Sequence, residues 1–119
     1  MEKIRIIIIE DDPDLRALMT LALVAQRFEV TSFSEADAFL KQGKGADLYI
    51  IDINLGGVSG LDLCQKIKES SNSRPVVIMI SANPDINNLA QEASADDALP
   101  KPFNSKDLLN KVMNHIAAA

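Results

Sequence analysis

The run of isoleucines within residues 4–9 constrains the fold of this chain more than any other feature. A β-branched run without polar alternation is typical of a strand covered on both faces, as in parallel sheets. Residues 47–53 and 75–80 are predicted as two further strands, and the second begins at a proline, which a strand tolerates at its first position. Shorter strands are predicted at 29–33 and 98–99.

Helical signals separate these strands. Asp12-Pro13 reads as an N-cap and first helical residue, and apolar residues then repeat at helical spacing up to Phe28. Asn83-Pro84 repeats this signal before a helix expected to reach about Ala93. Capping-box pairs open three other helices: Ser34 with Asp37, Ser59 with Asp62, and Asn104 with Asp107. Residues 54–58 are predicted as a glycine-rich loop.

Five strands alternating with five helices predict an α/β fold, with a parallel sheet, right-handed crossovers and helices on both faces. The 119 residues fit a single domain, 1–119, without room for a second. Because 47% of the residues are hydrophobic but only 4% aromatic, we expect an aliphatic core. Ligands of such folds bind beyond the carboxyl ends of the strands.

The composition of the chain argues against several classes of protein. The net charge of -5, without a stripe of Lys or Arg, argues against a nucleic-acid partner. Cys64 is the only cysteine, which excludes a disulfide framework and fits a reducing cytosol. The first apolar run is too short to span a membrane.

Acids, a hydroxyl and a lysine follow the predicted strands. Glu10 and Asp11 follow the first, Asp52 ends the third, Ser81 ends the fourth and Lys101 follows the fifth. Carboxylates at one edge would repel one another, and a hard cation such as Mg2+ would relieve this. A carboxylate can also attack phosphorus to form an aspartyl phosphate. Mg2+, the lysine ammonium and the serine hydroxyl would then stabilise the phosphoryl oxygens.

Each residue also has an ordinary structural explanation. Asp12 is better explained as an N-cap than as a ligand. Singly, Glu10 could be a solvated acid, Asp52 a strand-end cap, Ser81 a turn residue and Lys101 a surface lysine. Their joint placement at four strand ends is what favours a site. His115 and Cys64, in contrast, are interpreted as a surface or core histidine and a small core residue.

Four segments together resemble the receiver domain of two-component response regulators, over residues 3–116: Ile-Ile-Glu-Asp-Asp-Pro at 8–13, Asp-Ile-Asn-Leu-Gly-Gly-Val-Ser-Gly at 52–60, Ile-Ser-Ala at 80–82 and Leu-Pro-Lys-Pro-Phe at 99–103. The resemblance implies a flavodoxin-like, doubly wound five-stranded parallel sheet of order 2-1-3-4-5 with five helices. It also implies that Asp52 is the phosphoacceptor, and that Ser81 and Lys101 hold the phosphoryl oxygens. The implied ligands of Mg2+ (or Mn2+) are Asp11, Asp52, the main-chain carbonyl of Asn54 and, through water, Glu10.

The resemblance implies partners as well. The phosphoryl donor would be a sensor histidine kinase or a histidine phosphotransfer protein. Because no effector domain follows, we expect output through contact with a downstream protein effector, from a cytoplasmic monomer. The chain would be a signalling phosphoacceptor and not an enzyme, although it would assist its own phosphorylation and dephosphorylation.

Three positions depart from the family pattern. Gly56 replaces a common proline, so we expect a looser loop, and Ser94 replaces a common glycine. Ala98 stands where the family usually has Tyr, Phe or His. We therefore expect the response to phosphorylation to be carried by residues 81–84 and the following helix, and a notch between the last two helices.

Two local features are also predicted. The Lys101–Pro102 peptide should be cis, since the turn must point the lysine into the site. A docking patch for the kinase is predicted at Leu15, Leu18, Pro102 and Phe103, although both leucines could be core residues.

Three rival functions are less well supported. A haloacid-dehalogenase-like phosphatase would need an aspartate two positions after the nucleophile, where Asn54 stands. A receiver that signals by docking alone would have lost Asp52 or Lys101. A flavin-binding module would not have an acidic loop after its first strand.

Overall fold

The computed structural model describes residues 3–42, 44–70 and 74–117. Five strands form one parallel sheet of order β2-β1-β3-β6-β7, which confirms the predicted 2-1-3-4-5 topology. These strands are β1 (Arg5–Ile9), β2 (Glu29–Phe33), β3 (Leu48–Asp52), β6 (Val76–Ser81) and β7 (Asp97–Pro100). The helices are α1 (Pro13–Val24), α2 (Ala36–Gln42), α3 (Gly60–Ser70), α4 (Ile86–Glu92) and α5 (Ser105–Ala117). Within the described ranges, no helix is long and apolar enough to cross a membrane.

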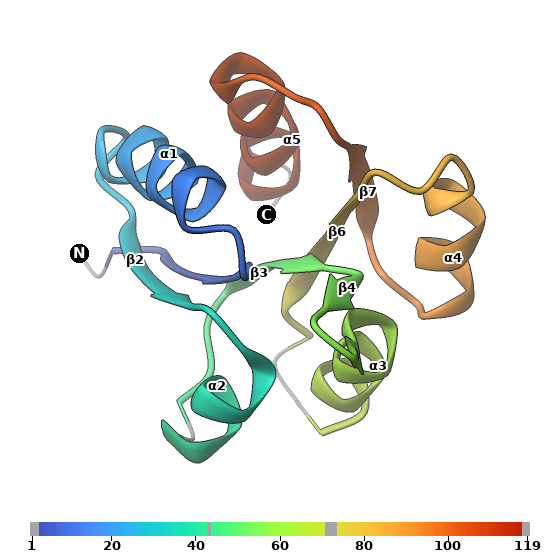
Figure 1. Cartoon of the computed structure of the whole chain (residues 1–119). Helices are drawn as coiled ribbons and strands as arrows, with labels where there is room; N and C mark the ends of the chain where they lie inside the picture. Colours follow the sequence, from blue (N-terminus) through green and yellow to red (C-terminus); the bar gives the residue numbers. More distant parts are fainter. Residues whose placement is uncertain (1–2, 43, 71–73, 118–119) are drawn as a thin grey trace.

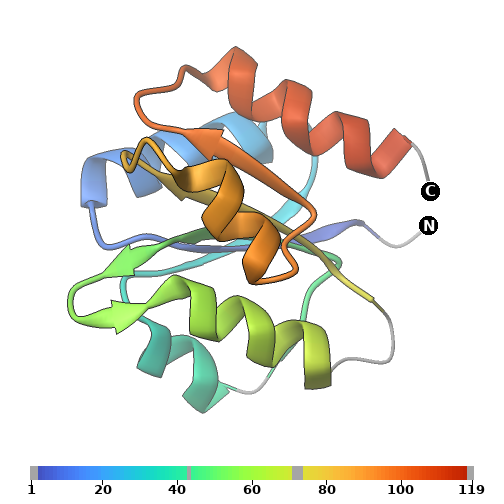
Figure 2. The same ribbon diagram turned by 90° about the vertical axis from the view of Figure 1, so that its right-hand side faces the viewer.

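The sheet has an apolar cluster on each face, so the fold has three layers (Figure 1; Figure 2). Ile6 and Ile8 of β1 point toward α1 and α5, while Ile7 and Ile9 belong to the cluster under α2, α3 and α4. This alternation follows from the period of two along a strand, and it explains why both faces of β1 need isoleucine. The core is aliphatic as expected, with Phe39 and Tyr49 as its buried aromatic residues.

Two of the predicted caps are confirmed in detail. Asp12 accepts hydrogen bonds from the main-chain N–H of Asp14 and Leu15 at the start of α1. Asn104 and Asp107 bond each other reciprocally before α5, with the Asp107 N–H donating to Asn104 Oδ1 at 2.8 Å. Short polar side chains at these positions satisfy helix N–H groups that have no partner within the helix.

Several predicted boundaries are wrong. Helix α1 ends at Val24, four residues before Phe28, because the chain turns through Arg27 at φ 68° to enter β2. Helix α4 begins at Ile86, since Asn83 Oδ1 accepts from the Asp85 N–H in a turn instead of capping a helix at Pro84. Ser59 likewise accepts from the Leu61 N–H and not from that of Asp62.

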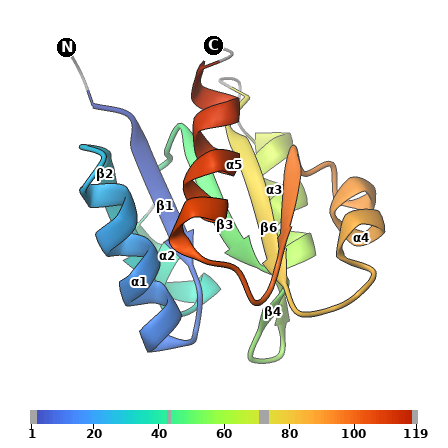
Figure 3. The ribbon, with the colours of Figure 1, turned by 90° about the horizontal axis from the view of Figure 1, so that it is seen from above.

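The glycine-rich segment after β3 is more regular than expected. It forms an antiparallel hairpin of β4 (Asn54–Leu55) and β5 (Val58–Ser59), visible beside the end of β3 in Figure 3. Gly56 and Gly57 make its turn at φ 60° and 98°, a conformation that side chains disfavour. The segment predicted as a loop is therefore a hairpin, because the glycines permit a tight turn.

Candidate phosphoacceptor site

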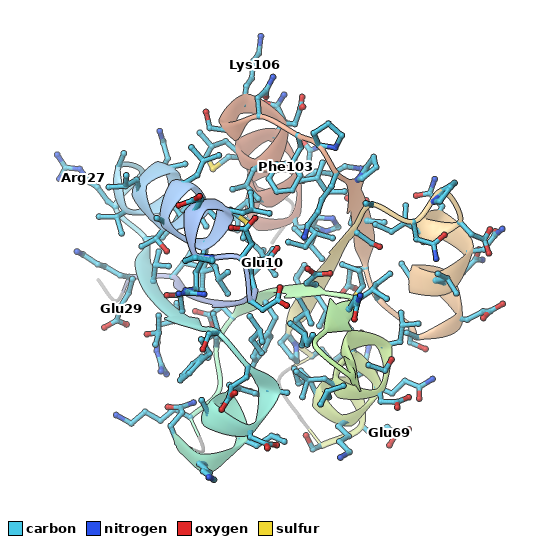
Figure 4. The ribbon with its side chains drawn as sticks, viewed as in Figure 1. Glu10, Arg27, Glu29, Glu69, Phe103 and Lys106 are labelled. Carbon is cyan, nitrogen blue, oxygen red and sulfur yellow. The ribbon has the colours of Figure 1, made fainter. Side chains whose placement is uncertain are left out.

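The predicted site residues meet at the carboxyl edge of the sheet. Glu10 directly follows β1, Asp52 ends β3, Ser81 ends β6, and Lys101 directly follows β7. Parallel pairing sets these ends side by side, since Asp52 pairs with Ile80 and Ser81 pairs with Pro100. Figure 4 shows Glu10 at this edge, in front of the strands.

Lys101 joins two of the acids. Its Nζ lies 2.7 Å from Glu10 Oε1 and 2.7 Å from Asp52 Oδ2. Burial acts to lower the pKa of Lys101, but its bonds to Asp52 and Glu10 outweigh burial and raise that pKa. The lysine is therefore a fixed cation between two carboxylates. The Lys101–Pro102 peptide is cis, as predicted.

Glu10 is the most deeply buried of the acids. Its side chain has no exposed surface, and its Oε2 accepts a hydrogen bond from the Asp12 N–H at 3.1 Å. Burial raises its pKa to about 7, against the opposing effects of Lys101 and the Asp12 N–H. Among the described residues, Oε1 accepts no aligned hydrogen bond, because the approach of Lys101 is an ion pair of poor hydrogen-bond geometry. A buried carboxylate oxygen in this state is suited to a further cationic or water partner.

Both carboxylate oxygens of Asp52 have a partner within the protein. Its Oδ1 accepts from the Asn54 N–H at 3.0 Å, its Oδ2 contacts Lys101, and the residue is 5% exposed. A Cβ atom at Gly60 would lie 2.0 Å from the Asp52 carbonyl oxygen, so no other residue fits there without moving the main chain. The glycine N–H also donates to the Ile53 carbonyl at 2.7 Å. These contacts tie the hairpin and the start of α3 to the main chain of Asp52.

Ser81 and Asp11 complete the set. Ser81 Oγ accepts from the Asn83 N–H at 3.0 Å, which leaves the hydroxyl hydrogen available to a ligand. Asp11 is exposed, and its carboxylate forms a cluster with those of Glu10 and Asp52, in which one oxygen from each lies within 4.8 Å of the others. Carboxylate oxygens at this spacing fit a hard divalent cation such as Mg2+.

Some residues have the ordinary role that the sequence suggested. Cys64 is fully buried, and its thiol lies 3.5 Å from the Ala93 carbonyl. His115 is partly buried and pairs with Asp97 at 2.9 Å. No sequence pattern indicates that pair, because the two residues are 18 positions apart.

Ala98 is covered by α4, whereas a notch between the last two helices was expected at this position. It is 6% exposed and packs in the cluster that includes Ile86 and Ala90 of α4, so it lines no open notch between the last two helices. A hollow of about 350 Å³ lies instead beside α5, lined by Leu99, Pro100, Pro102, Phe103, Asp107, Asn110, Lys111 and Asn114. The small side chain lets α4 cover β7 without leaving a gap over Ala98.

Two residues that support the site were not identified from the sequence. Gly60 appeared only as part of a motif, and its close approach to Asp52 depends on tertiary packing. Arg16, on the first helix, donates from Nη1 to the Glu10 main-chain carbonyl at 2.8 Å. A basic residue six positions after Glu10 is not a recognisable pattern, so the sequence offered no means of finding it.

Comparison with known proteins defines the class. The family model of the response regulator receiver domain matches residues 6–113, and the chain belongs to this family. Membership supports a phosphoacceptor role in two-component signal transduction.

Two response regulators illustrate the sequence similarity. The chain is 36% identical over 113 residues to response regulator RppA of Synechocystis, covering 91% of this chain and 48% of that protein. It is 30% identical to the DNA-binding response regulator MtrA of Mycolicibacterium smegmatis, with the same two coverages. The chain thus spans about half the length of the curated relatives it matches.

Solved structures agree with this assignment. The response regulator DrrB of Thermotoga maritima superposes with a TM-score of 0.90 at 27% identity, covering 98% of this chain and 54% of that one. The BeF3-activated receiver domain of DrrB has a TM-score of 0.88 at 27% identity and covers 98% of this chain and 99% of that one.

Proposed function

We propose that this receiver domain accepts a phosphoryl group on Asp52, with Ser81 and Lys101 as the groups that hold the phosphoryl oxygens. The observation that carries this proposal is the placement of Lys101 Nζ, 2.7 Å from Asp52 Oδ2 and from Glu10 Oε1. A lysine fixed at the acceptor by a second, buried acid is in place before any phosphoryl group arrives. Such preorganised charge is the main means of assisting phosphoryl transfer.

The proposed transfer is a displacement at phosphorus. An Asp52 carboxylate oxygen attacks the phosphorus of a phosphohistidine, the P–N bond breaks, and the imidazole leaves with the electron pair and takes a proton. The acyl phosphate that forms adds negative charge, which the Lys101 ammonium offsets. The Ser81 hydroxyl can donate a charge-assisted hydrogen bond to a phosphoryl oxygen.

A divalent cation is part of the proposal. Mg2+ (or Mn2+) would be held by Asp11, Asp52 and the Asn54 main-chain carbonyl, with Glu10 acting through water. When bound, it would supply positive charge beside the transferred group. The buried Glu10 Oε1 without an aligned donor and the clustered carboxylates support this set.

We further propose how partners are engaged. The donor is a sensor histidine kinase or phosphotransfer protein, and its docking patch consists of Leu15, Leu18, Pro102 and Phe103. Leu18 is 45% exposed, and Pro102 is exposed beside the acceptor. Leu15 and Phe103 are half-buried against the cluster under α1 and α5, so they have a core role as well. Output would go to a downstream protein effector from a cytoplasmic monomer, without direct contact to nucleic acid.

Substitution of Leu18 tests the docking patch. Because this side chain is largely outside the core, Leu18→Ala should leave the thermal unfolding temperature nearly unchanged but slow phosphotransfer from the cognate kinase. Leu40→Ala, which changes a leucine of similar exposure (48%) on α2, serves as the control. Equal transfer rates for Leu18→Ala and the control would remove Leu18 from the patch.

Labelling with a small donor tests the acceptor. Acetyl phosphate with Mg2+ should add one phosphoryl group to the wild type, visible by intact mass and lost in alkali. Asp52→Asn should not be labelled, while Asp62→Asn, which changes an exposed acid on α3, should be labelled like the wild type. Full labelling of Asp52→Asn would refute the assignment.

A further inference from the structure

The loop between β1 and α1, which carries the exposed Asp11, is fixed on both sides. Before Asp11, the Glu10 N–H donates to the Phe33 carbonyl at 3.0 Å, and the Glu10 carboxylate accepts from the Asp12 N–H. After it, Asp12 caps α1. The Glu10 main-chain carbonyl, which directly precedes Asp11, accepts a hydrogen bond as well.

Arg16 satisfies this carbonyl from α1. Its Nη1 donates to the Glu10 oxygen at 2.8 Å, while its own N–H donates to the Asp12 carbonyl at 2.9 Å. Its carbonyl accepts from the Thr20 hydroxyl at 2.8 Å, within the helix. The arginine is thus anchored in the regular part of the helix, and its side chain reaches back over the loop.

This use of a guanidinium is not that of an ordinary surface arginine. Arg16 is partly buried, and it takes part in none of the ion pairs found among residues 3–42, 44–70 and 74–117. Its charge-assisted hydrogen bond goes to the main chain next to a proposed metal ligand. Such a bond is stronger than one between neutral groups and restricts the peptide that joins Glu10 to Asp11.

We infer that Arg16 is a positioning residue for the metal site: its bond to the Glu10 carbonyl orients the Glu10–Asp11 peptide and so holds the Asp11 carboxylate ready for a divalent cation. This inference rests on the proposed function, because it assigns a support to the cation site proposed above. Positioning of this kind is usual in metal sites. Groups that orient a metal-ligating residue contribute to metal affinity, in addition to the contribution of the ligating residue itself.

The charge of Arg16 and its positioning role predict opposite changes in Mg2+ affinity when Arg16 is removed, which makes the inference testable. Arg16 is a cation near a site for a cation, so its charge alone opposes Mg2+ binding. If charge were its only effect, removing it would tighten Mg2+ binding. If Arg16 positions Asp11, removing it should weaken binding despite the relief of repulsion.

The experiment is a titration of the whole chain with Mg2+ alone, by calorimetry and by backbone amide NMR. Arg16→Met removes both the donor and the charge but keeps the apolar stem, and Arg16→Gln keeps a donor without the charge. Arg27→Met, at an exposed arginine beyond the opposite end of α1, controls for the loss of one positive charge (Figure 4). We expect Arg16→Met to raise the Mg2+ dissociation constant about tenfold or more, the effect of losing one charge-assisted hydrogen bond. Arg16→Gln should lie between Arg16→Met and wild type, and Arg27→Met should bind as tightly as wild type or slightly more tightly.

The outcomes separate this inference from the proposed function. A folded Arg16→Met that binds Mg2+ as tightly as wild type, or more tightly, overturns the inference and leaves Asp52 labelling untouched. A wild type that is labelled on Asp52 but binds no Mg2+ overturns both the inference and the metal part of the proposal. Weaker binding with the amide shifts of Asp11 altered before Mg2+ is added supports the inference. If Arg16→Met does not fold, Arg16→Gln decides: a dissociation constant at or below that of wild type counts against Arg16, and a raised one supports it.

Discussion

The ammonium of Lys101 and the carboxylate of Asp52 lie 2.7 Å apart although the residues are 49 positions apart in the chain. The same ammonium contacts Glu10, so one cation is shared by two acids that differ in burial and in strand of origin. This geometry makes Lys101 a competitor of any metal ion for the same oxygens. It also gives the lysine a second task, which is to offset charge on a phosphoryl group.

Substitution of Lys101 should separate these two effects. Lys101→Met should tighten Mg2+ binding, because the ammonium no longer competes for Glu10 and Asp52. The initial rate of labelling by acetyl phosphate should nevertheless fall roughly 100-fold, the usual effect of losing one transition-state donor. Lys106→Met, at the exposed start of α5, is the matched control (Figure 4). A variant labelled at the wild-type rate would show that Lys101 has no part in the transfer.

The response to phosphorylation should appear in α4 and the loop before it. Ser81 can turn its hydroxyl toward the new group, but Ala98 has no rotamer to change and is covered by α4. We expect backbone amide shifts on adding a beryllofluoride mimic to be large at residues 81–90 and small around Ala98. Large shifts centred on Ala98 would contradict this, and shifts confined to the immediate site would favour a phosphate relay without a conformational output.

Asp97 provides a prediction about pH. Burial acts to raise its pKa, but bonds from Lys111 at 2.8 Å and His115 at 2.9 Å outweigh burial and lower that pKa. Because the folded pKa is below the unfolded value of about 3.9, the pairing stabilises the fold fully above that pH and is lost as the pH falls through the folded pKa.

Asp97→Asn should therefore unfold at a lower temperature than wild type at pH 5, by an amount worth at most about 1 kcal/mol, because these partly exposed ion pairs are screened by solvent. The difference should shrink as the pH is lowered below about 4, where the acid is protonated first in the unfolded chain and then, below its lowered pKa, in the folded protein. Thermal unfolding followed by circular dichroism at several pH values measures both. A difference that stayed constant down to the lowest pH would show that the ion pairs are not its cause.

Cys64 should be inert in the native protein. Burial raises the pKa of its thiol to about 11, so little thiolate exists at pH 8, and the side chain has no exposed surface. We expect no reaction with a thiol-specific disulfide reagent at pH 8 until denaturant unfolds the chain. Reaction at the rate of a free thiol, without denaturant, would mean that α3 opens readily.

How far the sequence predicted the molecule depended on the range of each interaction. The buried strands and the caps at Asp12 and Asn104 were found because local residues determine them. The convergence of Glu10, Asp52 and Lys101 was also predictable, since parallel strands bring their carboxyl ends to one edge.

What the sequence did not reveal depends on the tertiary arrangement. The end of α1 is set by the turn through Arg27 into β2. The pairing of Asp97 with His115 likewise requires that α5 already lies along β7. None of these arrangements can be inferred from neighbouring residues alone.

The position of β3 in the middle of the sheet has a consequence for amide hydrogen exchange. Its main chain is paired with β1 on one side and with β6 on the other, and every residue from Leu48 to Asp52 is buried. Amides in such a strand exchange only when much of the protein unfolds, whereas loop amides exchange through local opening. The proposed acceptor therefore lies at the end of what should be the slowest-exchanging strand. A phosphoryl group on Asp52 should alter the exchange of residues 11–12 and 82–85, in the loops after β1 and β6, more than that of β3.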